Sequence, residues 1–381
     1  MAIDVDSSEE VSLDSDIYVS GVQKFFTYAG HYAYEPARTV FRNLERLSHT
    51  MPPEEAYQGE LRKRVQGVAT AIILLPFAAA LLIPAVACLT VAAAAGKGRF
   101  ELIGPSSPAS PWEGRSVEVV SINACFQDPW STFSGIKTPF EQVAPSMTRV
   151  AALVDAVAGP TILMGQEFES ISAQDEAIRL LRVKGYQYFL RDLGSHDPFK
   201  NSSGLFVASK VPLENIGFIP YPQEDRSGWM AKMSERGTLT FTVKVGGRDL
   251  RLINVHLNYA EGAENQAARN RQLTKYVVPL LRKGPAAVLG DLNFDTSAVP
   301  RQDSGLEGYT NAFEGIVTCT DEGKHTLRGK EGPCGDCAEK IDGLIYDEEL
   351  LKVENTQVCF LGKGRDCISD HAAISATLSF V

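Results

Sequence analysis

The chain has 381 residues, a formal net charge of −10 and 44% hydrophobic residues, a composition typical of a folded protein with a large buried core. Its acidity disfavours the class of proteins that grip duplex nucleic acid with a broadly basic surface, although a local basic groove stays compatible with it. The seven cysteines are too scattered for the disulfide framework of a small secreted domain.

Residues 1–66 are predicted to form an acidic tail followed by short amphipathic helices. Residues 1–16 contain six acidic and no basic side chains, whereas a secretory signal begins basic and then becomes apolar. The amphipathic stretches of residues 21–66 are interrupted by the motif MPPEE at 51–55.

Residues 67–96 are predicted to be a hydrophobic membrane segment. Residues 68–95 contain no charged side chain, and a bilayer core needs about 20 such residues. A buried core helix is the alternative interpretation. Pro76 and Pro84 would kink a spanning helix or mark a re-entrant hairpin. Basic residues flank both ends, so the side of the membrane on which the remaining chain lies stays open.

Residues 97–115 are rich in Pro, Ser and Gly and are predicted to be a linker. From residue 116 to residue 381, short runs rich in Val, Ile and Leu alternate with helical patterns. The runs GTLTFTVKV and RDLRLINVHL, joined by Gly246 and Gly247, predict a hairpin. Helices are predicted over 173–184, with Ser172 and Asp175 as a capping box, and over 264–283. This order predicts a mixed α/β sandwich.

Polar residues interrupt the apolar runs near their ends, where a rigid sheet can direct short side chains into one crevice. Each of them alone suits a turn or a helix cap. Together they provide carboxylates, amides and imidazoles, which suit a hard cation such as Mg²⁺ and proton transfer near a phosphate. The residues are Asn123, Glu167, His256, Asp291, Asn293, Asp342, Asp370 and His371.

The stretches SINACFQD, MGQEF, SGLFVASKVPLENI, NVHLNY, GDLNFD, KIDGLIY and SDHAAI occur in this order. As a set they resemble the endonuclease/exonuclease/phosphatase superfamily over residues 116–381. The resemblance implies a four-layer α/β/β/α sandwich, with two packed mixed β-sheets flanked by helices, and metal-dependent cleavage of phosphoesters.

The resemblance also implies a role for each polar residue. Glu167, Asn123 and Asp370 would hold Mg²⁺, with Mn²⁺ as a substitute. His371 would be the general base or would stabilise the developing phosphorane, and Asp342 would fix its tautomer. The remaining three would contact the water and the phosphate: Asp291 would orient the water, whereas Asn293 and His256 would bind phosphoryl oxygens.

Within this superfamily the sequence most resembles neutral sphingomyelinases, through SSGLFVASK, GDLNFD and the apolar segment before the catalytic region. A membrane-associated, Mg²⁺-dependent phosphodiesterase acting on a phospholipid head group is therefore our first hypothesis. One departure is Arg236, in WMAKMSERGTL, which stands where those enzymes carry a lysine preceded by an aspartate. Arg and Lys are not interchangeable, so phosphodiester chemistry is better supported than sphingomyelin as its substrate.

Three alternatives stay open. A nuclease of the same superfamily is disfavoured by the charge, by the apolar segment and by Ala373, where abasic-site enzymes place a proline. An inositol-phosphate phosphatase would carry a tryptophan before GD, which VLGDLNFD lacks. A member without catalysis is disfavoured because every expected polar position is filled. Cys334 and Cys337 form a CxxC pair that suits free thiols, a local disulfide or, with other ligands, zinc.

Overall fold

The structure is a computed structural model. The residues that it describes are 29, 33, 54–95, 101–105, 112–126, 147–194, 202–228, 232, 234–259, 262–296, 304–320, 338–360 and 368–381. The acidic tail over 1–16 and the pair Cys334 and Cys337 lie outside the described residues, so their predictions are not tested.

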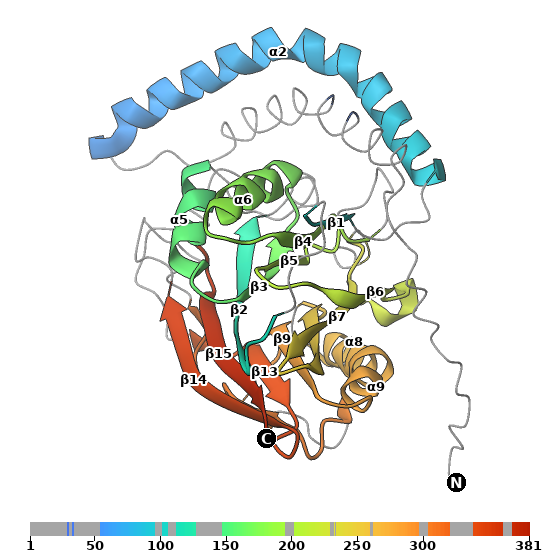
Figure 1. The fold of residues 1–381 in the computed structure, drawn as a ribbon. Helices are drawn as coiled ribbons and strands as arrows, with labels where there is room; N and C mark the ends of the chain where they lie inside the picture. Colours follow the sequence, from blue (N-terminus) through green and yellow to red (C-terminus); the bar gives the residue numbers. More distant parts are fainter. Residues whose placement is uncertain are drawn as a thin grey trace.

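Two mixed β-sheets form the centre of the molecule (Figure 1). The first has seven strands in the order β1-β4-β5-β3-β2-β15-β14, with β2 and β3 parallel. Its strands are β1 (Glu101–Ile103), β2 (Ser116–Phe126), β3 (Ile162–Phe168), β4 (Tyr188–Arg191), β5 (Phe206–Ser209), β14 (Leu351–Phe360) and β15 (Ala372–Phe380).

The second sheet has six strands in the order β10-β13-β9-β8-β7-β6, with β8 and β9 parallel. Its strands are β6 (Glu214–Pro220), β7 (Gly237–Val245), β8 (Arg248–His256), β9 (Ala286–Asp291), β10 (Thr310–Asn311) and β13 (Asp342–Tyr346). The predicted hairpin is confirmed, because β7 and β8 pair antiparallel through the turn at Gly246 and Gly247. The short strands β11 (Cys319–Thr320) and β12 (Ala338–Glu339) pair separately.

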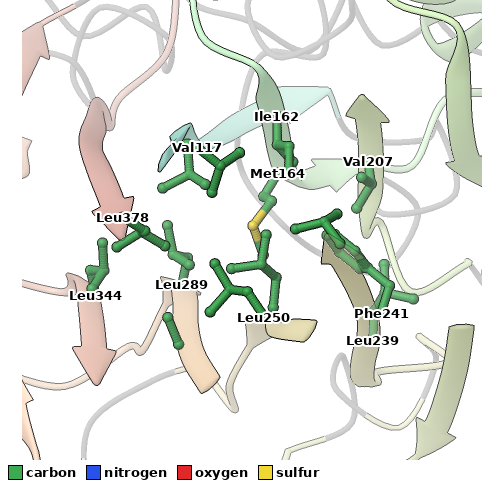
Figure 2. Close-up of a cluster of buried hydrophobic side chains, with 14 of the residues drawn as sticks. Val117, Ile162, Met164, Val207, Leu239, Phe241, Leu250, Leu289, Leu344 and Leu378 are labelled. Atoms are coloured by element: carbon green, nitrogen blue, oxygen red, sulfur yellow. The ribbon is translucent and has the colours of Figure 1, made fainter. Parts of the chain in front are cut away.

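The two sheets pack face to face over a core of buried apolar side chains (Figure 2). Met164 of β3 and Leu250 of β8 meet there, together with Leu289 and Leu378. The outer face of the first sheet is covered by α5 (Met147–Val157) and α6 (Ile171–Val183). The outer face of the second sheet is covered by α8 (Ala263–Gln272), a π-helical turn (Leu273–Val277) and α9 (Val278–Leu281). Two packed mixed sheets with helices are therefore confirmed.

The apolar segment lies in one continuous helix of 42 residues, α2 (Glu54–Ala95), which arches in Figure 1. Pro76 and Pro84 lie inside it without ending it, so the hairpin alternative is not the conformation seen. The stretch Val68–Cys88 is long and apolar enough to cross a membrane, and 17% of it is buried. The membrane assignment rests on the length and composition of this stretch.

Three sequence predictions need correction. Helix α2 runs through position 66, so no structural boundary separates residues 54–66 from the apolar segment. Residues 101–103 form strand β1 and are therefore not part of a linker. Helix α6 begins at Ile171 and is capped by Ser170, whose side chain accepts a hydrogen bond from the Ala173 amide, because the chain turns directly after β3.

Candidate active site

The polar residues predicted at strand ends meet at one end of the two sheets. Parallel strands β2 and β3, and β8 and β9, end there, whereas the antiparallel strands β13 and β15 begin there. In the second sheet, His256, Asp291 and Asp342 are register neighbours, so one row carries an imidazole and two carboxylates. Leu250 and Leu252 of β8 are buried between the sheets. Because alternate residues of a strand share a face, His256 lies on the same face, at the end of the apolar run.

Asp291 is the centre of the cluster. Its Oδ2 accepts a hydrogen bond of 3.0 Å from Asn123 Nδ2 and lies 3.5 Å from His256 Nε2 and 3.8 Å from His371 Nε2. Asn123 Nδ2 also donates to Glu167 Oε1 at 3.1 Å, so one amide links the two sheets at the site.

His371 and Asp342 form a buried pair with 2.8 Å between Nδ1 and Oδ2. A carboxylate at this nitrogen favours the tautomer with a proton on Nδ1, which leaves Nε2 as the basic atom. Because Nε2 faces Asp291, the basic atom points into the cluster. The pair has the geometry of a general base with its orienting partner.

Burial shifts the pKa of two of these groups toward the neutral form. The pKa of Asp291 is raised to about 7, mainly because the carboxyl is buried and further because Asp342 and Glu167 lie near, although His371 and Asn123 oppose the shift. The pKa of His256 is lowered well below its usual range by burial, and then by the charges of Arg236 and His371. His256 is therefore a neutral imidazole that can donate a hydrogen bond without carrying charge.

Strained backbone aims two of the side chains. Glu167 has φ 55° and Asn293 has φ 52°, a left-handed conformation that costs energy for residues other than glycine. Gly204 lies against Glu167, since a Cβ on Gly204 would be 3.0 Å from the Glu167 Cα. Such strain at a strand end is typical of functional sites.

Three supporting groups were not identified from the sequence. The Thr318 hydroxyl accepts from the Asp342 amide at 3.0 Å, and the Thr318 carbonyl accepts from Ala372 at 2.7 Å. Arg149 of α5 donates to the carbonyls of Ala124, Cys125 and Ile368, and so joins the loops that carry Asn123 and His371. These contacts are made to backbone atoms, which leave no pattern in a sequence.

The third supporting group is a polar link buried between the sheets beneath the site. Gln166 Nε2 donates to Asn254 Oδ1 at 2.8 Å and to Ser121 Oγ at 3.1 Å. Asn254 in turn donates to the carbonyls of Gly165 and Phe206. The link ties β3 to β8 directly below Glu167 and His256.

The oxygen atoms present fit a hard divalent cation. Asp370 Oδ1 is buried and has no hydrogen-bond partner among the described residues. The pKa of the buried Cys125 thiol is raised mainly by burial and further by the negative charges of Asp370 and Glu167, so both carboxylates lie near this thiol. The described residues contain no group of three or more His, Cys, Asp or Glu with metal spacing. Mg²⁺ needs no such cage, because it commonly binds one or two carboxylates and completes its shell with water and substrate.

The side chains of Asn123 and Asn293, predicted to contact the metal and the phosphate, already make hydrogen bonds to backbone atoms. The Asn123 oxygen accepts from the Cys125 amide at 3.1 Å, so its nitrogen faces the carboxylates. Asn293 donates through Nδ2 to the Leu257 carbonyl at 3.1 Å, which Arg236 also contacts at 2.9 Å. Arg236 thus lies beside the site, where its charge acts on His256.

Solved structures share this fold. A variant of beta toxin from Staphylococcus aureus, with bound magnesium ions, matches with a TM-score of 0.51 and 15% identity over 68% of this chain and 99% of that chain. Sphingomyelinase C from Streptomyces griseocarneus matches with a TM-score of 0.50 and 15% identity over 69% of this chain and 99% of that chain. SmcL matches with a TM-score of 0.52 and 14% identity over 69% of this chain and 99% of that chain.

No curated protein matches the chain. The sequence profile of the Endonuclease/Exonuclease/phosphatase family matches residues 120–371, which include every residue of the cluster. This chain therefore belongs to the endonuclease/exonuclease/phosphatase family of metal-dependent phosphoric ester hydrolases.

Proposed function

We propose that this chain is a Mg²⁺-dependent phosphodiesterase that hydrolyses the head-group ester of a phospholipid at a membrane. The observation that carries the chemistry is the buried Asp342–His371 pair, whose basic nitrogen faces Asp291. Support for the lipid comes from helix α2 and from the shared fold with sphingomyelinase C and with beta toxin.

Glu167 and Asp370 would hold the Mg²⁺, or Mn²⁺ in its place, and Asn123 would hold the Glu167 carboxylate in position. The bound cation would neutralise negative charge that grows on the phosphoryl oxygens during the reaction. The magnesium ions bound to the beta toxin variant agree with this choice.

The remaining residues would activate water and bind the phosphate. Asp291 orients the attacking water, and His371 removes its proton at Nε2 while Asp342 stabilises the imidazolium that forms. His256, kept neutral by burial, donates a hydrogen bond to a phosphoryl oxygen. Asn293, whose Nδ2 carries a second hydrogen besides the one given to Leu257, donates another.

The test uses the full-length protein in detergent, with Mg²⁺ or EDTA. It is offered sphingomyelin, phosphatidylcholine, a phosphoinositide and abasic DNA. We expect Mg²⁺-dependent release of a phosphorylated head group, and a rate lower by roughly 10²–10⁴-fold for Glu167→Gln and His371→Ala. Asp249→Asn, an exposed carboxylate of β8 outside the site, should keep the full rate.

Each other outcome has a definite meaning. Cleavage of DNA without lipid turnover would overturn the lipid assignment, and release of inorganic phosphate from the phosphoinositide would indicate a phosphatase. Absence of turnover on all four substrates, or full activity of His371→Ala, would overturn the proposed chemistry.

A further inference from the structure

The chain enters the catalytic region at the active-site end of the first sheet. Glu101, the first residue of β1, pairs with Arg191, and β4 pairs with β5 through Leu190 and Val207. Phe206, the next residue along β5, pairs with Gly165. Glu101 therefore lies at the height of Gly165, two residues before Glu167, and β1 then runs away from the site.

This entry point is fixed by a buried ion pair. Arg191 Nε lies 2.8 Å from Glu101 Oε2, and both side chains are less than a tenth exposed. Arg191 also pairs with Asp175 of α6. The start of β1 is thus clamped to the sheet and to the helix layer at the same height.

The connector between α2 and this clamp is short. Only residues 96–100 separate Ala95 from Glu101, and a fully extended chain spans at most about 3.6 Å per residue, or roughly 20 Å. Three strand spacings of about 4.8 Å separate β1 from β3, which adds roughly 14 Å. The two residues from Gly165 to Glu167 add about 7 Å, so Glu167 can lie no further than roughly 40 Å from the end of α2.

The rim at this end presents apolar side chains. Tyr259, three residues beyond His256, is 52% exposed, and Ile316, two residues before Thr318, is 40% exposed. The sequence between α2 and β1 includes Lys97 and Arg99, residue types that suit anionic lipid head groups. The far end of the sheets carries the turn at Gly246 and Gly247, and the C-terminus lies opposite β1 in Figure 1.

We propose that the active-site end of the two sheets faces the bilayer that holds α2, and that the loops with Tyr259 and Ile316 contact lipid. This inference rests on the membrane part of the proposed function. The physical reason is that the clamp and the short connector hold the site end within roughly 20 Å of the end of α2, whereas the far end lies a strand length further away.

The test reconstitutes the full chain in phosphatidylcholine vesicles with some phosphatidylserine and a photoactivatable phosphatidylcholine. After irradiation, mass spectrometry locates the labelled peptides. We expect labelling of α2 and of the peptides with Tyr259 and Ile316, several-fold above the peptides with Val183 and Val381, exposed apolar residues at the far end. Equal labelling at both ends, or labelling of α2 alone, would overturn the inference, as would failure of α2 to be labelled.

Two sets of variants test the clamp. An insert of about 12 Gly and Ser residues between 96 and 100, with a root-mean-square length of roughly 20 Å, should reduce labelling of the rim. The same insert at the Gly246–Gly247 turn should not. Ile316→Ser should lower turnover of vesicle lipid several-fold, and Val183→Ser should not. Rim labelling unchanged by the connector insert would contradict the proposal.

A soluble phosphodiester, bis(p-nitrophenyl) phosphate, separates the two claims. Its Mg²⁺-dependent hydrolysis should be the same for wild type, Ile316→Ser and the connector insert. Loss of this activity in the wild type would refute the chemistry, whereas the labelling pattern alone decides the orientation.

Discussion

Asp342 acts on the reaction through the imidazole of His371. Its Oδ2 lies 2.8 Å from His371 Nδ1, and the carboxylate is 2% exposed, so no water can replace it easily. In Asp342→Asn the amide can present a donor to Nδ1, which favours the tautomer whose Nε2 is protonated and cannot accept a proton. We expect kcat on a soluble phosphodiester to fall by about 10³–10⁴-fold.

The fold should survive this substitution, since Asn has the size of Asp and the Thr318 hydroxyl still accepts from the backbone amide at position 342. Thermal unfolding followed by circular dichroism checks this. Asp249→Asn serves as the control. A kcat within a few-fold of wild type for Asp342→Asn would show that His371 works without its partner.

Asp291 couples the stability of the metal-free protein to pH. Burial raises its pKa from 3.8 to about 7, so between these values the folded protein holds a proton that the unfolded chain releases. The stability that this group contributes is complete below the unfolded pKa and is lost as pH rises through the folded pKa. In EDTA we expect the Tm to fall between about pH 4 and about pH 7, with a smaller fall for Asp291→Asn.

The two proteins are compared by the slope of Tm against pH and not by Tm itself, because Asp291→Asn also changes the contact with Asn123 at every pH. Asp249→Asn should keep the slope of the wild type. If Asp291→Asn kept it as well, another group would be responsible for the pH dependence.

Among the elements, the loop before β5 sets the position of the main carboxylate on β3. Gly204 has φ +71°, and a Cβ there would lie 3.0 Å from the Cα and 3.1 Å from the amide nitrogen of Glu167. Gly204→Ala must therefore shift Glu167. Because small changes around a ligand weaken metal affinity by about 10–100-fold, we expect a Kd for Mg²⁺ higher by at least about 10-fold in isothermal titration calorimetry.

Gly185 offers a matched control. Its φ of +91° makes alanine equally strained, yet a Cβ would meet nothing within 4 Å. Gly185→Ala should cost about 1–2 kcal/mol of stability and leave the Kd for Mg²⁺ unchanged. A similar loss of affinity in both variants would attribute the effect to general destabilisation.

The elements that could be predicted from sequence are those that the core determines. Strands such as β3 and β9 are continuous apolar runs because both faces are covered, and their polar ends revealed the site. Strand β14 was missed since LKVENTQVCF is largely exposed and polar. The cap of α6 was misplaced from Ser170 to Ser172, because two serines near one helix start give the same pattern.

The site was predictable to a similar degree. The identities of His256, Asp291, Asp342 and His371 followed from strand ends, and the structure brings them together. Their pKa shifts, the left-handed backbone of Glu167 and the contacts of Thr318 depend on tertiary burial and backbone geometry, which one sequence does not encode in a readable pattern.

At the scale of the whole molecule, the first sheet includes a strand at residues 101–103, before residue 116. Strand β1 covers the edge strand β4, and Glu101 neutralises a buried arginine. Burial lowers the pKa of Arg191 to about 10, which shows how unfavourable its charge is in that environment. Without β1, the strand edge of β4 is open to intermolecular pairing and Arg191 keeps Asp175 as its ion-pair partner among the described residues.

Fragments 101–381 and 116–381 test this boundary. Removing one partner of a buried ion pair costs about 3–5 kcal/mol, so we expect the free energy of unfolding of 116–381 to be lower than that of 101–381 by about this amount. Its urea midpoint should fall accordingly, and it should aggregate at higher protein concentration. Glu101→Gln in the longer fragment keeps the strand and its backbone hydrogen bonds and removes only the charge, so it should lose a comparable free energy, about 3–5 kcal/mol, without the aggregation. Equal urea midpoints for the two fragments would mean that β1 is dispensable, and that the sheet ends at β4 without cost.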